Sequence, residues 1–231
     1  MGFFREEGIA VLAYRGASAY EPGNSMRAIA KALELEADGI IIDTRFTKDG
    51  VAIAYADEDL EVLGVRKPVS GVAFNELKQA GAVSVATVRE VINAVRDKAK
   101  LVLIPRDGKG RWLIDLLKSE DFTDNAVIAH HDIAVLSECK ALGGNLKVAA
   151  IINNPFPHVS MLRRRGVDFI VMPYSLLRGR VVKEVHGNGM EVIAWVINDV
   201  ATYIKVAALG VDAVATEKPD IRREAEKLKL V

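Results

Sequence analysis

Residues 37–55 read ADGIIIDTRFTKDGVAIAY, and they hold a strand, a turn and the start of a second strand. The run Gly39–Thr44 is apolar up to Asp43 without alternation, which is typical of a strand buried on both faces of a parallel sheet. Asp49-Gly50 stands between this run and Val51–Tyr55, and Asp-Gly in that position is a hairpin signal. We therefore expect Val51–Tyr55 to fold back as an antiparallel arm.

Seven further apolar runs alternate with amphipathic segments along the chain. These runs are Ile9–Tyr14, Leu101–Pro105, Ala126–His130, Val148–Ile152, Phe169–Met172, Glu191–Val196 and Ala213–Thr216. Helices are predicted over Met26–Glu36, Val88–Lys98, Lys109–Lys118, Ile133–Leu142, Pro157–Arg165, Leu177–Asn188, Asp199–Leu209 and Asp220–Leu230. Eight βα units predict an α/β fold, a TIM (β/α)8 barrel that forms a single domain over residues 1–231, with a short β-hairpin arm after strand 2. An open doubly wound sheet is the alternative.

The composition limits the classes of partner. The chain has 231 residues, with 31 Lys and Arg, 31 Asp and Glu, four His and one Cys. The balanced charge predicts no nucleic-acid partner. A single cysteine excludes an intramolecular disulfide and a cysteine-based structural zinc site. The apolar runs are too short to span a bilayer, and the start of the chain has no long apolar segment, so a cytoplasmic location is expected.

In a TIM barrel the functional residues lie at the carboxyl ends of the strands. The polar and small residues at those ends form a set with a recognisable order. It consists of Tyr14-Arg15-Gly16, Glu21-Pro22-Gly23-Asn24-Ser25, Asp43, Thr47-Lys48-Asp49-Gly50, Ala56-Asp57, Trp195-Val196-Ile197-Asn198 and Gly210–Pro219. This set resembles that of the glycerophosphodiester phosphodiesterase family, from about Ile9 to Asp220.

The resemblance implies an active site with two histidines for proton transfer and a divalent ion held by carboxylates. The two histidine positions are occupied here by Tyr14 and Ala56. Three carboxylate positions are occupied by Gly23, Ile41 and Ile104, and an Arg106 stands where the family has lysine. The chain is therefore expected to be a divergent member that lacks most catalytic residues.

The residues that remain favour anion binding. We expect Arg15, Asn24, Arg106 and Trp195 to bind a small anionic or phosphate-bearing ligand, because guanidinium groups match phosphate oxygens in a bidentate manner. Asp43 is the one remaining metal-ligand position. No cofactor is expected, although a weakly bound Mg²⁺ or Ca²⁺ on Asp43 stays open. Arg15 could instead pair with Asp43 or Asp57.

His130 and His131 end the fourth barrel strand, so one of them could replace a lost acid–base group. Adjacent residues on a strand point to opposite faces, and only one can enter the mouth. Asn198 is expected to cap the following helix, and Asn24 or Ser25 the first one. Thr87 and Glu90 predict a capping box.

Three functions follow from these residues. The first is a catalytically impaired phosphodiesterase-like protein that binds an anion at the barrel mouth. The second is an active metal-dependent phosphodiesterase with a non-standard site. The third is an interaction protein, which could be a homo-oligomer, that docks a partner on an apolar barrel rim. Whether the chain is an enzyme stays open at this point.

Overall fold

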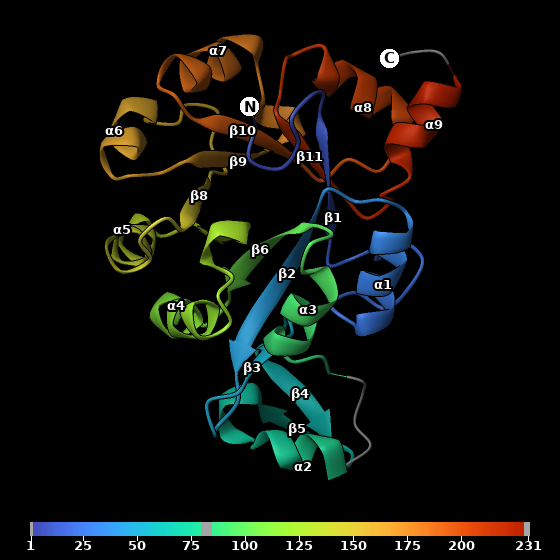
Figure 1. The fold of residues 1–231 in the computed structure, drawn as a ribbon, viewed down its shortest axis with the longest axis vertical. Helices are drawn as coiled ribbons and strands as arrows, with labels where there is room; N and C mark the ends of the chain where they lie inside the picture. Colours follow the sequence, from blue (N-terminus) through green and yellow to red (C-terminus); the bar gives the residue numbers. More distant parts are fainter. Residues whose placement is uncertain (1, 80–84, 229–231) are drawn as a thin grey trace.

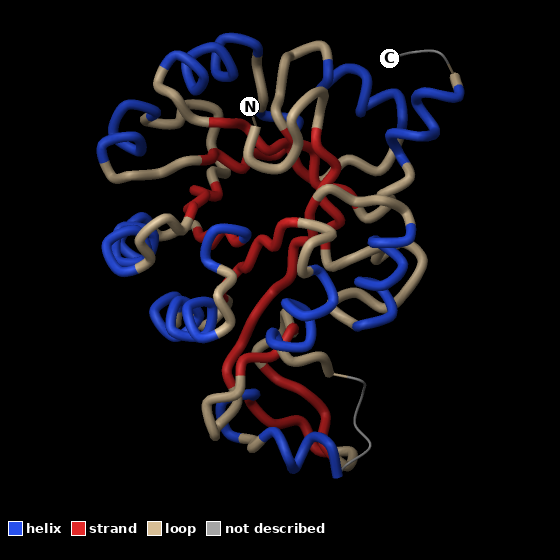
Figure 2. Tube along the Cα trace, viewed as in Figure 1, coloured by secondary structure: helices blue, strands red, loops and turns tan. Residues whose placement is uncertain are grey.

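The computed structural model describes residues 2–79 and 85–228. Its main sheet contains eight parallel strands that close into a ring (Figures 1 and 2). They are β1 (Ala10–Tyr14), β2 (Gly39–Phe46), β6 (Lys100–Pro105), β7 (Ala126–His130), β8 (Lys147–Ile151), β9 (Phe169–Pro173), β10 (Glu191–Trp195) and β11 (Ala213–Thr216). The ring closes because β1 pairs with β2 on one side and with β11 on the other. The predicted (β/α)8 barrel is confirmed, and closure excludes the open sheet.

Helices surround the ring of strands, as the tube in Figure 2 shows. They are α1 (Met26–Glu34), α3 (Val88–Val95), α4 (Gly110–Ser119), α5 (Ile133–Leu142), α6 (Val159–Arg164), α7 (Gly179–Gly187), α8 (Val200–Ala207) and α9 (Ile221–Lys227), with short 3-10 turns at Val69–Gly71, Thr123–Asn125 and Tyr174–Leu176. The end of the last predicted helix, at Leu230, lies outside the described residues. In the described part of the chain, no helix has the length and apolar character needed to cross a membrane.

Three helix starts test the predicted caps. Ser25 caps α1 by accepting a hydrogen bond from the amide of Ala28. Thr87 and Glu90 form the expected capping box of α3. The prediction for Asn198 was wrong, because the N-cap of α8 is Asp199, whose carboxylate accepts from the amide of Thr202. A carboxylate one residue later satisfies the same orphan amides, which leaves Asn198 free for another role.

Side-chain alternation along the strands divides the apolar core into two layers. The inner layer fills the barrel with residues such as Leu12, Ile41, Val102, Ile104 and Phe169. The outer layer lies between the strands and the helices. Asp43 and Arg45 follow Ile41 at two-residue steps on β2, so the alternation directs them toward the barrel axis at its carboxyl end.

The arm after β2 is confirmed and is part of a larger insertion. Strand β3 (Ala52–Ala54) runs antiparallel to β2, with Phe46 opposite Ala52. The chain continues through a second hairpin, β4 (Asp59–Val62) and β5 (Val65–Pro68), and helix α2 (Phe74–Gln79). These elements project from the barrel in Figure 1 and pack on a small apolar cluster that includes Ile53, Leu60 and Leu77. The elements after β3 were not predicted from the sequence.

The amino-terminal end of the barrel is closed. Phe3 and Phe4 pack on Phe169, with ring centroids 5.7 and 5.3 Å from it. Just before β2, Asp38 accepts hydrogen bonds from Arg5, from Arg222 and from the amide of Val11. Aromatic rings and ion pairs cover this end of the barrel, so the opposite end, where the strands have their carboxyl ends, is the one open to a ligand.

Candidate functional site

The centre of the barrel mouth is the carboxylate of Asp43. Its side chain is fully buried, and both oxygens accept hydrogen bonds from other side chains. Arg15 Nε lies 2.7 Å and Asn24 Nδ2 lies 3.1 Å from Oδ2, whereas Arg106 Nε lies 2.6 Å from Oδ1. Arg106 Nη2 adds a second contact to Oδ1 at 2.5 Å. Four residues from three separate parts of the sequence therefore meet at one ion-pair cluster.

The loop after β1 places Arg15 and Asn24. Both residues have φ of 59°, the left-handed region that side chains other than glycine rarely adopt. Arg15 is held by its amide, which donates to the carbonyl of Ile41, and its own carbonyl accepts from the amide of Asn24. The Asn24 side chain also contacts the backbone of β2, because its Oδ1 accepts from the amide of Asp43. Asn24 therefore positions the carboxylate of Asp43.

Arg106 comes directly after β6, and its neighbour across the sheet is Arg45 at the end of β2. Thr44 is paired with Pro105, and the amide of Arg106 donates to the carbonyl of Thr44. Arg45 was missed in the sequence analysis. Its two-residue spacing from Asp43 on a predicted strand was the available signal, because that spacing places both side chains on one face.

The cluster carries more positive than negative charge. One carboxylate faces the two guanidinium groups of Arg15 and Arg106, whose side chains are each 35% exposed. Burial alone would lower the pKa of Arg15, but Asp43 outweighs it and the pKa is raised above its ordinary value. Among the described residues, the Nη groups of Arg15 and Nη1 of Arg106 have no hydrogen-bond partner. Unpaired guanidinium N–H groups are hydrogen-bond donors of the kind that anions accept from.

Aromatic residues form the wall beside Arg15. The Arg15 guanidinium lies 5.1 Å from the centroid of the Tyr14 ring, and Tyr14 contacts Trp195 edge-to-face at 6.1 Å. Both rings pack on the inner barrel layer. Tyr14 offers a phenol at the first of the two positions where the family resemblance implies a histidine. At the second histidine position, Ala56 contributes only its carbonyl, which accepts from Arg45 Nε at 3.0 Å.

Asn198 connects the far side of the mouth. Its Oδ1 accepts from the hydroxyl of Thr216 and the amide of Glu217, and its Nδ2 donates to the Glu217 carboxylate at 2.7 Å. The side chain thus joins the end of β10 to the end of β11. Asp57, the other partner considered for Arg15, is exposed and acts on the Arg15 charge only at longer range.

His130 and His131 stack on each other with ring centroids 4.3 Å apart. Val127 and Ala129 belong to the inner layer and Ile128 to the outer one, so alternation assigns His130 to the outer face. His130 is buried, and its Nδ1 accepts from the amide of Asp132. Burial and His131 lower the pKa of His130, which keeps the ring neutral at physiological pH. His131 is exposed at the rim.

The donor set at the mouth does not fit a divalent cation. Ile41 and Ile104 present hydrocarbon, and a side chain at Gly23 would bring its Cβ to 3.1 Å from Cβ of Arg15. Asp43 supplies the one carboxylate of the cluster, and both its oxygens already contact guanidinium groups. Across residues 2–79 and 85–228, no group of three or more His, Cys, Asp or Glu side chains is arranged to hold a metal ion. A divalent cation at Asp43 would be repelled at short range by the two guanidinium charges of Arg15 and Arg106.

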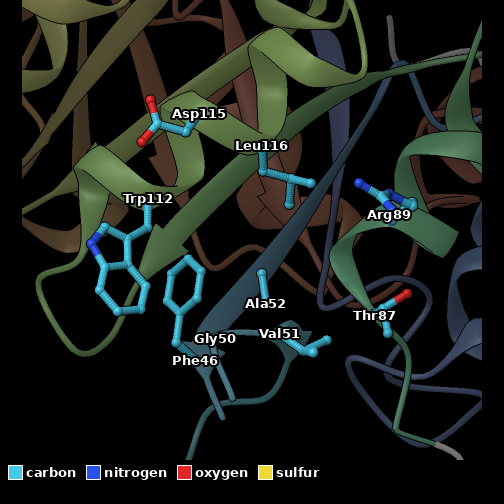
Figure 3. A pocket seen from close by; sticks show the side chains of 9 residues that line it. All are labelled: Phe46, Gly50, Val51, Ala52, Thr87, Arg89, Trp112, Asp115 and Leu116. Atoms are coloured by element: carbon cyan, nitrogen blue, oxygen red, sulfur yellow. The ribbon is translucent and has the colours of Figure 1, made fainter. Parts of the chain in front are cut away.

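A separate groove lies outside the barrel, and Figure 3 shows its lining. It has a volume of about 480 Å³ and contains Phe46, Trp112 and Leu116, with Arg89 and Asp115 at its border. The rings of Phe46 and Trp112 meet edge-to-face at 5.2 Å. No residue predicted for the site lines this groove.

Comparison with known proteins supports the assignment of the fold. Residues 15–105 match the model of the glycerophosphoryl diester phosphodiesterase family. A glycerophosphodiester phosphodiesterase of Caldanaerobacter subterraneus subsp. tengcongensis is 26% identical over 231 residues, which cover 91% of this chain and 94% of the relative.

Solved structures agree with the sequence comparison. A glycerophosphodiester phosphodiesterase of Thermotoga maritima superposes with a TM-score of 0.81 at 22% identity, covering 95% of this chain and 99% of the other. An Oleispira antarctica phosphodiesterase in complex with the product sn-glycerol-3-phosphate gives a TM-score of 0.81 at 20% identity, over 94% of this chain and 96% of the other. The match to the family model, the relatives of similar length and the closed barrel together support membership of the glycerophosphodiester phosphodiesterase family.

Proposed function

We propose that the chain is a catalytically impaired member of its family that binds a phosphate-bearing ligand at the barrel mouth. The observation that carries the proposal is the cluster of Arg15, Asp43 and Arg106, in which two guanidinium groups enclose one buried carboxylate. A net positive cluster with free N–H donors is suited to an anion.

Catalytic impairment follows from the chemistry of the groups at the mouth. Phosphodiester hydrolysis needs a proton acceptor for the attacking water and a proton donor for the leaving oxygen, and each is worth about 10²- to 10⁴-fold in rate. The described mouth offers the phenol of Tyr14 and the carbonyl of Ala56 where the family resemblance places histidines. His130 lies on the outer face, so it is poorly placed to replace them.

The ligand is proposed to sit on the side of the two arginines that faces away from Asp43. Its phosphate oxygens would accept from the Nη groups of Arg15 and from Nη1 of Arg106. Trp195 and Tyr14 would contact its carbon skeleton. Asn24 and Asp43 act indirectly, because they hold the guanidinium groups at the mouth.

An assay for glycerol 3-phosphate release from glycerophosphocholine tests the impairment. The protein is assayed with Mg²⁺, Ca²⁺, Mn²⁺ or EDTA, beside an active relative as a positive control. We expect no metal-dependent turnover above background. Metal-dependent hydrolysis that disappears in Asp43→Asn would replace this proposal with the second candidate, an active phosphodiesterase with a non-standard site.

Thermal unfolding with ligand tests the binding. A ligand that binds only the folded state raises the melting temperature by mass action. Inorganic phosphate and glycerol 3-phosphate at millimolar concentration should raise it in the presence of EDTA. An unchanged melting temperature, with no heat of binding in calorimetry, would contradict anion binding at the mouth.

A further inference from the structure

Arg45 supplies a third cation at the barrel mouth, beside Arg15 and Arg106. Its Nε donates to the carbonyl of Ala56 at 3.0 Å. Within the described part of the chain, no carboxylate lies in ion-pair distance of its guanidinium, in contrast to Arg15 and Arg106. A half-buried guanidinium with unused donors is costly unless water or an anionic group satisfies it.

A cavity of about 490 Å³ lies between the barrel rim and the insertion, and Arg45 and Arg106 both line it. The insertion contributes Glu58, Val69 and Ser70, and the segment after β6 contributes Asp107 and Lys109. Arg106 therefore pairs with Asp43 and also lines this cavity. A ligand whose phosphate contacts Arg106 has room to extend toward Arg45.

The two acidic residues of the cavity differ in their availability. Asp107 is satisfied by the backbone, because its oxygens accept from the amides of Phe46 and Lys109. Glu58 is exposed at the edge of the insertion. Helix α4 begins directly after Lys109, with no side-chain cap and no acidic residue in its first turn. Its amide dipoles add to the positive potential at this edge, where Asp107 is the carboxylate that accepts from the amide of the N-cap residue.

We propose that this cavity binds a second anionic group of the ligand, a carboxylate or a second phosphate, through Arg45. The proposal rests on phosphate binding by Arg15 and Arg106 and extends it to a ligand class: organophosphates that carry an additional negative charge. Arg45 is the specificity-determining residue, and Glu58 opposes the same charge from the insertion.

Two small probes that differ at one group test the proposal. In 3-phosphoglycerate a carboxylate replaces the terminal hydroxymethyl group of glycerol 3-phosphate. Titration calorimetry with EDTA present should show that the wild-type protein binds 3-phosphoglycerate about tenfold more tightly, as one charge-assisted hydrogen-bonded pair provides. Equal affinities of the two probes would overturn the proposal, although binding of both would leave the proposed function intact.

Variants assign the preference to Arg45. Arg45→Gln should bring the two affinities together, whereas Arg45→Lys should keep part of the preference because it keeps the charge. Arg164→Gln serves as the matched control, since Arg164 is exposed on α6. A preference that survives in Arg45→Gln would overturn the assignment.

Glu58→Gln supplies a test that does not disturb the rim, because Glu58 is exposed. It should strengthen binding of 3-phosphoglycerate more than binding of glycerol 3-phosphate. Unchanged affinities would count against an anion in this cavity. If neither probe nor inorganic phosphate binds to the wild-type protein, the proposed function itself has failed, which is a different outcome from loss of the preference alone.

Discussion

Each end of the barrel contains a carboxylate that is held by two arginines. At the closed end, Asp38 pairs with Arg5 and Arg222 and remains 12% exposed, and it also accepts from the amide of Val11. At the mouth, Asp43 is fully buried between Arg15 and Arg106, and its further contacts are with Asn24. The same three charges are thus used in two different environments.

The two carboxylates differ in the groups that they bind, because Asp38 binds a backbone amide as well as arginines. At the closed end, three aspartates each directly precede a strand and accept from the amide of the second residue of the neighbouring strand. They are Asp38, Asp168 and Asp212, which accept from the amides of Val11, Val148 and Val192. This repeated bond is structural. Asp43 makes no such bond with its carboxylate. Its contacts are all with side chains that face the mouth, which indicates a site that orients arginines.

The largest expected effect is on the stability of the folded protein when either Asp43 or Asp38 loses its charge. Asp43→Asn should lower the free energy of unfolding by about 3 kcal/mol, because it leaves two partly buried guanidinium groups without a counter-charge. Asp38→Asn should cost about 1 kcal/mol, since the Asp38 side chain remains 12% exposed whereas that of Asp43 is fully buried. Urea unfolding of both variants gives the two values. If Asp43→Asn were as stable as the wild-type protein, the carboxylate would not be the partner that holds the arginines.

The next largest effect is a difference in phosphate affinity between variants of Arg15 at the mouth and Arg222 at the closed end. Arg15→Gln should weaken inorganic phosphate binding about tenfold, because it removes one charged donor pair. Arg222→Gln removes the same charge at the closed end and should leave phosphate affinity unchanged. Calorimetry on both variants checks this. Equal losses would show that phosphate responds to the overall charge of the protein rather than to the mouth.

A smaller effect concerns pH at the closed end. Burial and the neighbouring Asp212 raise the pKa of Glu191 above its ordinary value of 4.5. The folded state therefore binds this proton more tightly than the unfolded state, and stability falls as pH rises from 4.5 through the folded pKa. Glu191→Gln should remove that fall. Urea unfolding between pH 4 and 7 measures it, and parallel curves for variant and wild type would contradict it.

At the open end the expected sign is opposite. Burial lowers the pKa of His130 below its ordinary value of 6.5, so the unfolded state binds this proton more tightly. Stability should fall as pH drops below 6.5, until the folded pKa is passed. His130→Gln should flatten the curve from pH 7 downward. A dependence that stays the same in the variant would assign the acid sensitivity to another group.

Much of the fold was predictable because each strand has a strong local signature. Continuous apolar runs such as Gly39–Thr44 predicted buried parallel strands, and Asp49-Gly50 predicted the arm that β3 forms. The elements beyond β3 were missed because β4 and β5 are short, and β5 is exposed throughout. The small apolar cluster on which they pack also needs Ile53 and Leu77, which belong to neighbouring elements and not to either strand.

At the site, the sequence determined which chemical groups are available. It placed Asp43, Arg15 and Arg106 at the carboxyl ends of three different strands. It also showed that other residues occupy the positions where the family resemblance implies catalytic groups, namely Tyr14, Gly23, Ile41, Ala56 and Ile104. A residue identity fixes what a side chain can donate, accept or titrate, independent of its surroundings. The expected scarcity of metal ligands followed from composition and position alone.

Only the tertiary structure decided which of those groups form ion pairs and hydrogen bonds with one another. Closure of the barrel brings residues 15, 24, 43 and 106 within hydrogen-bond distance, although they are up to 91 positions apart along the chain. That proximity makes Asp43 a partner of arginines and Asn24 a support for Asp43. It also places Arg45 beside the cavity with no carboxylate of residues 2–79 and 85–228 in ion-pair distance of its guanidinium. Ion pairing depends on distance and burial, and both are set by the folded chain rather than by any segment of it.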